Sequence, residues 1–103
     1  MRFHPLERLI NLYDGYRRHI KIDQLDLVLA QEQGQLYIFQ SRCPHRGQPL
    51  EQAAINDGRL VCPLHQYVFD LGSGAQQEQL CAALTIWVPI YEGNQVGIAV
   101  EDP

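Results

Sequence analysis

Two short stretches decide the fold of this chain: Ser41–Leu50, which reads SRCPHRGQPL, and Cys62–Gln66, which reads CPLHQ. In each stretch a cysteine is followed directly by proline, with a histidine close behind. Proline restricts the backbone after each cysteine, so we expect both stretches to be loops. Two such loops, brought together by a hairpin, would bring two thiolates and two imidazoles to one point.

The four side chains concerned are Cys43, His45, Cys62 and His65. Two Cys and two His suit either tetrahedral zinc or an iron–sulfur cluster in which two His replace two Cys. A lone Cys or His is more often a packed or surface residue, but two matched half-sites favour a metal centre. Zinc modules usually pair Cys with Cys and His with His in sequence, whereas these halves are mixed.

The remaining sequence predicts an antiparallel β-protein, because most of it has the two-residue period of strands interrupted by turn residues. Turns are predicted at Gln33-Gly34, Asp57-Gly58 and Glu92–Gln95. Helical patterns are weak and are limited to Leu6–Leu12 and Glu51–Ile55. Such an arrangement implies a sandwich or small barrel. The predicted strands are Arg17–Ile22, Asp26–Gln31, Leu36–Phe39, Leu60–Val61, Tyr67–Asp70, Thr85–Tyr91 and Val96–Val100.

Composition predicts a single small globular domain. The chain has 103 residues, of which 46% are apolar and 19% charged. Eight basic residues stand against 12 acidic ones, a formal charge of −4, which disfavours binding to nucleic acid or to an anionic membrane. We expect a soluble cytoplasmic protein, since no anchor or export signal is visible and three cysteines indicate metal or redox chemistry.

The pattern C-P-H-R-G-x-P-L followed by C-P-L-H resembles the Rieske 2Fe-2S proteins, and the resemblance extends over nearly the whole chain. It implies an all-β fold of stacked antiparallel sheets in one domain over residues 1–103. A small cluster-binding subdomain would be formed by two loops, about 41–50 and 62–67. One 2Fe-2S cluster is implied, with Cys43 and Cys62 on the inner iron and His45 and His65 on the outer iron.

This sequence also departs from the pattern of the family. Membrane-anchored members carry an extra Cys in each loop, joined as a disulfide, and here Gln48 and Leu64 occupy those places. Tyr67 and Phe69 stand where high-potential members place a Ser and a Tyr hydroxyl against the cluster. Fewer donors to the sulfur atoms lower the potential, so we expect a midpoint of about −150 mV. Gln66 replaces a common glycine, which puts the local loop conformation in doubt.

The resemblance implies a Rieske-type ferredoxin that carries single electrons between a reductase and an oxygenase or similar acceptor. We expect no catalytic site, because only His4 and His19 remain for a second iron. The alternatives are the small Rieske-like subunit of a nitrite-reductase-type complex and a structural zinc module. Retention of all four ligands favours the carrier. Cys81 is expected to be a buried small hydrophobic residue, or part of the cover of the cluster.

Overall fold

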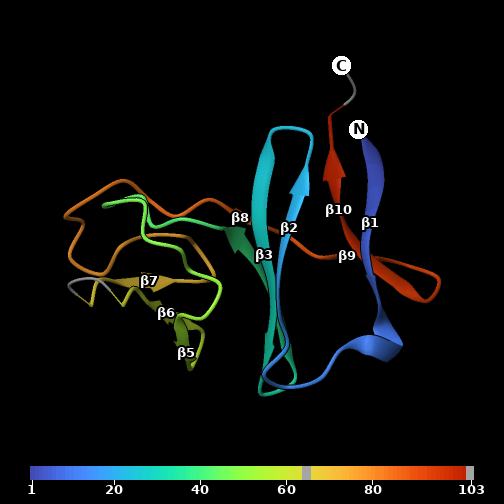
Figure 1. The fold of residues 1–103 in the computed structure, drawn as a ribbon, viewed down its shortest axis with the longest axis horizontal. Helices are drawn as coiled ribbons and strands as arrows, with labels where there is room; N and C mark the ends of the chain where they lie inside the picture. Colours follow the sequence, from blue (N-terminus) through green and yellow to red (C-terminus); the bar gives the residue numbers. More distant parts are fainter. Residues whose placement is uncertain (64–65, 102–103) are drawn as a thin grey trace.

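The computed structural model describes residues 1–63 and 66–101 and consists mainly of three antiparallel sheets (Figure 1). Their strand orders are β1-β10-β9, β2-β3-β4-β8 and β5-β6-β7. The elements are β1 (Arg2–Arg8), η1 (Leu9–Asn11), β2 (Arg17–Ile22), β3 (Leu25–Glu32), β4 (Gln35–Gln40), β5 (Ala54–Asn56), β6 (Arg59–Val61), β7 (Val68–Asp70), β8 (Ile86–Trp87), β9 (Ile90–Glu92) and β10 (Gln95–Val100).

The sheet β2-β3-β4-β8 is central because strand β3 is buried on both of its faces. Successive side chains of a strand point to opposite faces, and the four residues of Leu27–Ala30 are all 0% exposed. The β3–β4 turn has Gln33 at φ 52° and Gly34 at φ 75°, as a tight hairpin of this kind requires. The predicted strands Arg17–Ile22, Asp26–Gln31 and Leu36–Phe39 are thereby confirmed.

Two hydrophobic clusters pack against the two faces of this central sheet. Val28, Ala30 and Phe39 belong to the cluster that includes residues of β6 and β7. Leu27, Leu29 and Ile38 belong to the other, which includes residues of β1 and β10. Because neighbouring residues of β3 alternate between the clusters, the central sheet is layered between the other two. The expected stack of antiparallel sheets is confirmed.

The two predicted helical stretches are wrong in most of their length. Leu6–Arg8 continues strand β1, which pairs with β10, and only Leu9–Asn11 forms a single 3-10 turn. Residues 54 and 55 lie in β5, where Ile55 pairs with Leu60 of β6. In both places pairing with a partner strand outweighs a weak local helical pattern.

The predicted strand Thr85–Tyr91 is divided at Val88 and Pro89. Its first part, β8, pairs with β4 of the central sheet, and its second part, β9, pairs with β10. Proline has no N–H to donate to a sheet, so the chain leaves one sheet and enters another at this point.

The small sheet β5-β6-β7 carries the two loops that the sequence singles out. Residues 41–50 follow β4 and lead toward β5, and residues 62–67 connect β6 to β7. Figure 1 shows this unit standing beside the larger part of the molecule. Among the described residues, no helix is long and apolar enough to cross a membrane.

Candidate metal centre

Both cysteine loops are closed by the same backbone hydrogen bond. The N–H of Cys43 donates to the carbonyl of Gln48 at 2.8 Å, and the N–H of Cys62 donates to the carbonyl of Tyr67 at 2.8 Å. In each case the acceptor is the fifth residue after the cysteine. The two half-sites that match in sequence therefore also match in the backbone hydrogen bond made by their cysteine.

Further contacts make the first loop compact. The N–H of Gly47 donates to the Cys43 carbonyl at 2.7 Å, and Gly47 has φ 73°, a conformation that glycine adopts without strain. The Arg42 guanidinium donates from Nη1 to the Gly47 carbonyl at 3.0 Å. At the base of the loop, the Leu50 N–H donates to the Ser41 carbonyl at 2.8 Å. The backbone on both sides of Cys43 is thus held by its own loop.

In the second loop, Gln66 adopts the conformation for which glycine would be expected. Its φ is 54°, in the left-handed region that non-glycine residues seldom occupy. The absence of glycine after His65 therefore does not prevent the positive φ. His65 itself, one of the four predicted ligands, lies outside the described residues.

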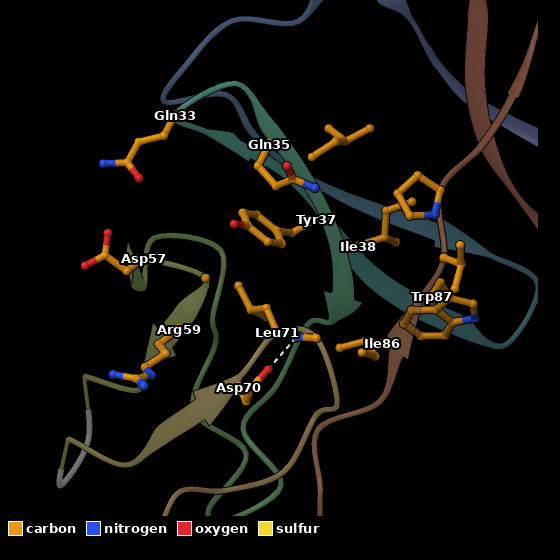
Figure 2. Close-up of a pocket in the computed structure, with 15 residues that line it drawn as sticks. Gln33, Gln35, Tyr37, Ile38, Asp57, Arg59, Asp70, Leu71, Ile86 and Trp87 are labelled. Carbon is orange, nitrogen blue, oxygen red and sulfur yellow. Dashed lines mark hydrogen bonds between the residues drawn. The ribbon is translucent and has the colours of Figure 1, made fainter.

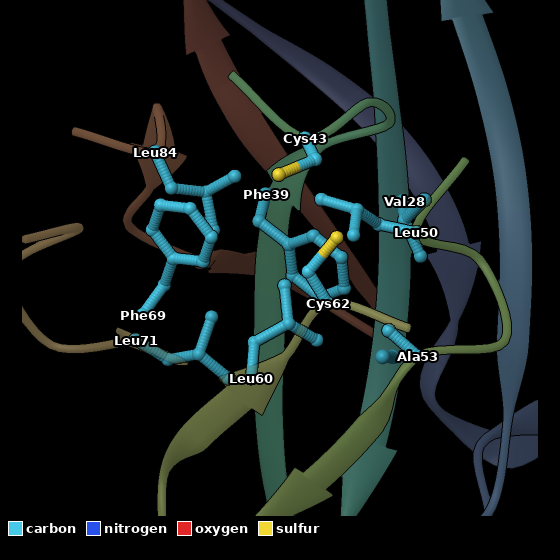
Figure 3. Close-up of a cluster of buried hydrophobic side chains, with 11 residues drawn as sticks. Val28, Phe39, Cys43, Leu50, Ala53, Leu60, Cys62, Phe69, Leu71 and Leu84 are labelled. Atoms are coloured by element: carbon cyan, nitrogen blue, oxygen red, sulfur yellow. The ribbon is translucent and has the colours of Figure 1, made fainter. Parts of the chain in front are cut away.

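The two predicted cysteine ligands lie in the same buried cluster. Cys43 is 2% exposed and Cys62 is 0% exposed, and no disulfide joins any of the three cysteines. Figure 3 shows both thiols among the apolar side chains of Phe39, Leu50 and Leu60. Residues far apart in sequence thus bring two sulfur ligands into one water-poor region.

The predicted ligand His45 comes from the first loop and contacts the second. Its residue is half-buried and its Nδ1 atom is buried. Its ring stacks on the ring of Tyr67, with centroids 4.0 Å apart and planes 15° apart. No sequence pattern indicated this contact, because stacking between two loops depends on how the loops meet.

Cys81 packs against the same cluster from a third segment of chain. It is half-buried, rather than fully buried as expected. Burial raises the pKa of the Cys81 thiol, and negative charge on Cys43 raises it further. Cys81 therefore belongs to the surroundings of the buried cluster that contains Cys43 and Cys62.

These residues fit an iron–sulfur centre with mixed ligands. Two buried thiols and one buried imidazole nitrogen provide sulfur and nitrogen donors, the donor set of a 2Fe-2S cluster in which His replaces Cys on one iron. Within residues 1–63 and 66–101, no three His, Cys, Asp or Glu side chains gather closely enough to hold a single metal ion. The donors that are described belong to two loops, an arrangement compatible with a cluster held between them.

A separate cavity of about 650 Å³ lies between strand β4, the β5–β6 turn and strand β8. Figure 2 shows Tyr37, Asp57, Arg59 and Trp87 around it. Of the predicted ligands within the described residues, Cys43, His45 and Cys62 do not line this cavity. Asp70, at its wall, already accepts hydrogen bonds from the Gly72 and Ser73 N–H groups. The cavity is therefore distinct from the candidate metal centre.

Comparison with known proteins identifies a family for nearly the whole chain. The model of the Rieske [2Fe-2S] domain matches residues 4–91. Apoptosis-inducing factor 3 of Mus musculus is 28% identical over 64 residues, 62% of this chain but only 11% of that protein. The ferredoxin component of a naphthalene 1,2-dioxygenase system of Pseudomonas aeruginosa is 28% identical over 94 residues, 87% of this chain and 88% of that protein. The chain thus spans about a tenth of the length of the first relative and most of the second.

Solved structures show the same fold at lower identity. The Sphingomonas yanoikuyae B1 ferredoxin has a TM-score of 0.82 at 19% identity, covering 97% of this chain and 100% of that one. A ferredoxin chain from the complex of oxygenase and ferredoxin of carbazole 1,9a-dioxygenase has a TM-score of 0.79 at 17% identity, covering 94% and 92%. A structure assigned to the small subunit of a nitrite reductase has a TM-score of 0.79 at 20% identity, covering 97% and 100%.

Proposed function

The chain belongs to the Rieske [2Fe-2S] domain family, and we propose that it acts as a Rieske-type ferredoxin, carrying single electrons from a reductase to an oxygenase or similar acceptor. The observation that carries this proposal is the convergence of two identically closed loops, which bury Cys43 and Cys62 in one cluster. The ferredoxin component of the naphthalene 1,2-dioxygenase system, similar over most of both chains, supports it.

Four residues of this chain would hold the cluster: Cys43 and Cys62 through sulfur, and His45 and His65 through nitrogen. Burial of both cysteines and of the His45 Nδ1 atom supports this set. When bound, a 2Fe-2S cluster supplies a one-electron redox couple whose potential depends on net charge, hydrogen bonds to sulfur and solvent exposure.

The protein's own contribution is to hold the ligands in place and keep water from them. The backbone bonds at Cys43 and Cys62 tie each cysteine to its own loop. Phe39, Leu60 and Phe69, all 0% exposed, line the region around the two thiols. Such a low-polarity setting destabilises extra charge, which favours the oxidised state and a low potential.

The remaining parts of the assignment are also proposals. We treat residues 1–103 as one domain, because the central sheet contributes to both hydrophobic clusters. We assign no catalytic site to the chain, and its partners would be redox proteins, as in the carbazole 1,9a-dioxygenase complex of oxygenase and ferredoxin. A reducing compartment such as the cytoplasm agrees with three cysteines that form no disulfide.

The test is to express the full chain with added iron, purify it without oxygen and measure iron, acid-labile sulfide and the magnetic resonance spectrum of the reduced protein. We expect about two irons and two sulfides per chain. Cys43→Ser and Cys62→Ser should abolish this content, whereas Cys81→Ser, a matched control at the third cysteine, should retain it. A colourless protein that contains zinc and no sulfide would overturn the proposal in favour of a structural zinc module.

A second candidate function is that of a permanent subunit of a nitrite-reductase-type complex. The structural similarity to the chain assigned to a nitrite reductase small subunit favours it. Gel filtration with the candidate partners separates the two functions. A stable stoichiometric complex indicates a subunit, and a transient association that still permits electron transfer indicates a carrier.

A further inference from the structure

Residues 74–84 form a loop whose two ends are held together directly. The Leu84 N–H donates to the Gly74 carbonyl at 2.7 Å. Gly74 has φ +84°, and a Cβ atom added there would lie 2.1 Å from the Leu84 carbonyl oxygen. The ends can approach this closely only because residue 74 has no side chain.

Within this loop, the side chain of Gln76 organises the residues that follow. Gln76 is 3% exposed, and its Oε1 atom accepts hydrogen bonds from the N–H of Glu78 at 3.0 Å and of Leu80 at 2.7 Å. Its backbone forms a bridge with Phe69. The side chain thus ties residues 78–80 to the edge of the small sheet. This happens where the backbone pairing with β7 ends, at the bridge between Gln76 and Phe69.

The Gln76 amide is buried at a cost. Among the described residues, its Nε2 atom has no hydrogen-bond partner. A buried donor without an acceptor is destabilising, and turning the side chain outward would let water satisfy it. The two hydrogen bonds to Oε1 account for its inward position, since turning outward would break both.

The far end of this loop reaches the candidate metal centre. Cys81 packs against the cluster that contains Cys43 and Cys62, and Leu84 belongs to that cluster. Figure 3 shows Leu84 beside Phe69 in the same group of side chains as Cys43. The loop therefore forms a third wall beside the two cysteine loops.

We propose that Gln76 is a positioning residue: it fixes the 74–84 loop against the Cys43 side of the metal centre, so that the loop limits access of water and small reagents there. The inference rests on the proposed function in taking Cys43 as a ligand. The conformational part, that Gln76 keeps the loop closed, concerns this chain's own residues alone.

The test uses the full, cluster-loaded chain and the alkylation of Cys81 by iodoacetamide, followed by mass spectrometry. Gln76→Met has a similar volume but lacks both the acceptor and the donor, and it should speed Cys81 alkylation about tenfold, since two hydrogen bonds are lost. Gln77→Met makes the same chemical change at the exposed neighbour and should change the rate less than twofold.

A second readout is the rate at which a chelator bleaches the cluster, which should rise several-fold in Gln76→Met and stay unchanged in Gln77→Met. Equal rates of Cys81 alkylation in Gln76→Met and the wild type would overturn the proposal. So would metal-free Gln76→Met protein in which all three cysteines react faster by one common factor, because the whole fold would then have opened. If every variant is purified without a cluster, the proposed function fails, and the Cys81 rates still decide the role of Gln76.

Discussion

Tyr67 stacks on His45 across the gap between the two cysteine loops, with ring centroids 4.0 Å apart and planes 15° apart. Each residue belongs to a loop that is closed by its own cysteine N–H. The contact between the two rings therefore links two loops, each of which is closed by its own backbone hydrogen bond. It orients the imidazole from the loop that carries the other cysteine.

The first prediction concerns this stacking. Tyr67→Ala should weaken the hold on His45 and speed loss of the cluster about 2- to 10-fold, since a ring pair contributes about 0.5–1.5 kcal/mol. Tyr67→Phe keeps the ring and serves as the control, with a rate close to that of the wild type. The measurement is the decay of cluster absorbance in the presence of a chelator. Equal decay in the Ala and Phe variants would mean that the stack does not position His45.

The second prediction concerns Gln66, which has φ 54°. A left-handed conformation costs a residue with a side chain about 1–2 kcal/mol, and the added flexibility of glycine costs about 0.5–1 kcal/mol. Gln66→Gly should thus leave the stability unchanged or raise it by up to about 1 kcal/mol. Gln66→Val should lower it by at least about 1 kcal/mol, because branched residues avoid this region. Urea unfolding of both variants measures these changes in stability. A Gln66→Gly variant clearly less stable than the wild type would contradict the left-handed conformation of residue 66.

The third prediction concerns pH and the carboxylate of Glu7, which joins strand β1 to the start of the central sheet. Its pKa is lowered from 4.5 to about 2 by hydrogen bonds from the Asn11 amide, the Tyr16 hydroxyl and the Arg8 N–H. The Tyr16 Oη atom lies 2.6 Å from Glu7 Oε2. Because the pKa in the folded state is depressed, this group stabilises the protein above about pH 4.5, and the stabilisation is lost as the pH falls toward 2.

Glu7→Gln should therefore lower the free energy of unfolding by about 2 kcal/mol at pH 7. The difference from the wild type should shrink at pH 3 and vanish near pH 2. Urea unfolding of both proteins across this range measures it. Arg18→Gln is the control and should cost less than about 0.5 kcal/mol, since the Arg18 side chain is 55% exposed. A difference that does not depend on pH would show that the carboxylate charge is not involved.

The fourth prediction separates backbone strain from collision at Gly74. Gly93 has a similar φ of +59°, but nothing lies within 4 Å of a Cβ atom added there. Gly93→Ala should cost about 1 kcal/mol for the left-handed conformation alone. Gly74→Ala should cost about 3 kcal/mol or more, because its Cβ would collide with the Leu84 carbonyl. If Gly74→Ala and Gly93→Ala lower the stability to thermal unfolding by similar amounts, the 74–84 loop relaxes easily to admit the added Cβ atom.

The fifth prediction is the midpoint potential. Phe69 is 0% exposed and carries no hydroxyl group, and the Tyr67 ring lies against His45. Because Phe69 cannot donate a hydrogen bond to sulfur, the midpoint should lie near about −150 mV, the low end of the Rieske range. A redox titration checks this value, and a midpoint above about +100 mV would contradict it.

Most of the fold could be predicted from sequence, because strands with one polar face leave a clear alternating pattern. Arg17–Ile22 is the best example: its predicted bounds are those of β2. The failures occurred where the local pattern is short. Leu6–Leu12 has helical spacing, yet its first half pairs with β10, a partner almost 90 residues further along the chain. Local spacing carries no information about so distant a partner.

At the candidate site, too, some features could be predicted from the sequence and others could not. The paired Cys-Pro motifs indicated Cys43 and Cys62, and the structure buries both. The stacking of Tyr67 on His45 and the inward amide of Gln76 could not be predicted, since each depends on how separate loops meet in space. The positive φ of Gln66 shows a further limit: a missing glycine does not exclude the conformation that glycine favours.

The two-sided burial of β3 has a consequence for how the protein matures. Among the described residues, the cluster between the central sheet and β1-β10 contains none from the span 41–81, so its contacts do not involve either cysteine loop. The opposite face of the same sheet packs against Cys43 and Cys62. We therefore expect a shortage of iron to disturb first the face of β3 that meets the cysteine loops, and last the face that meets β1-β10.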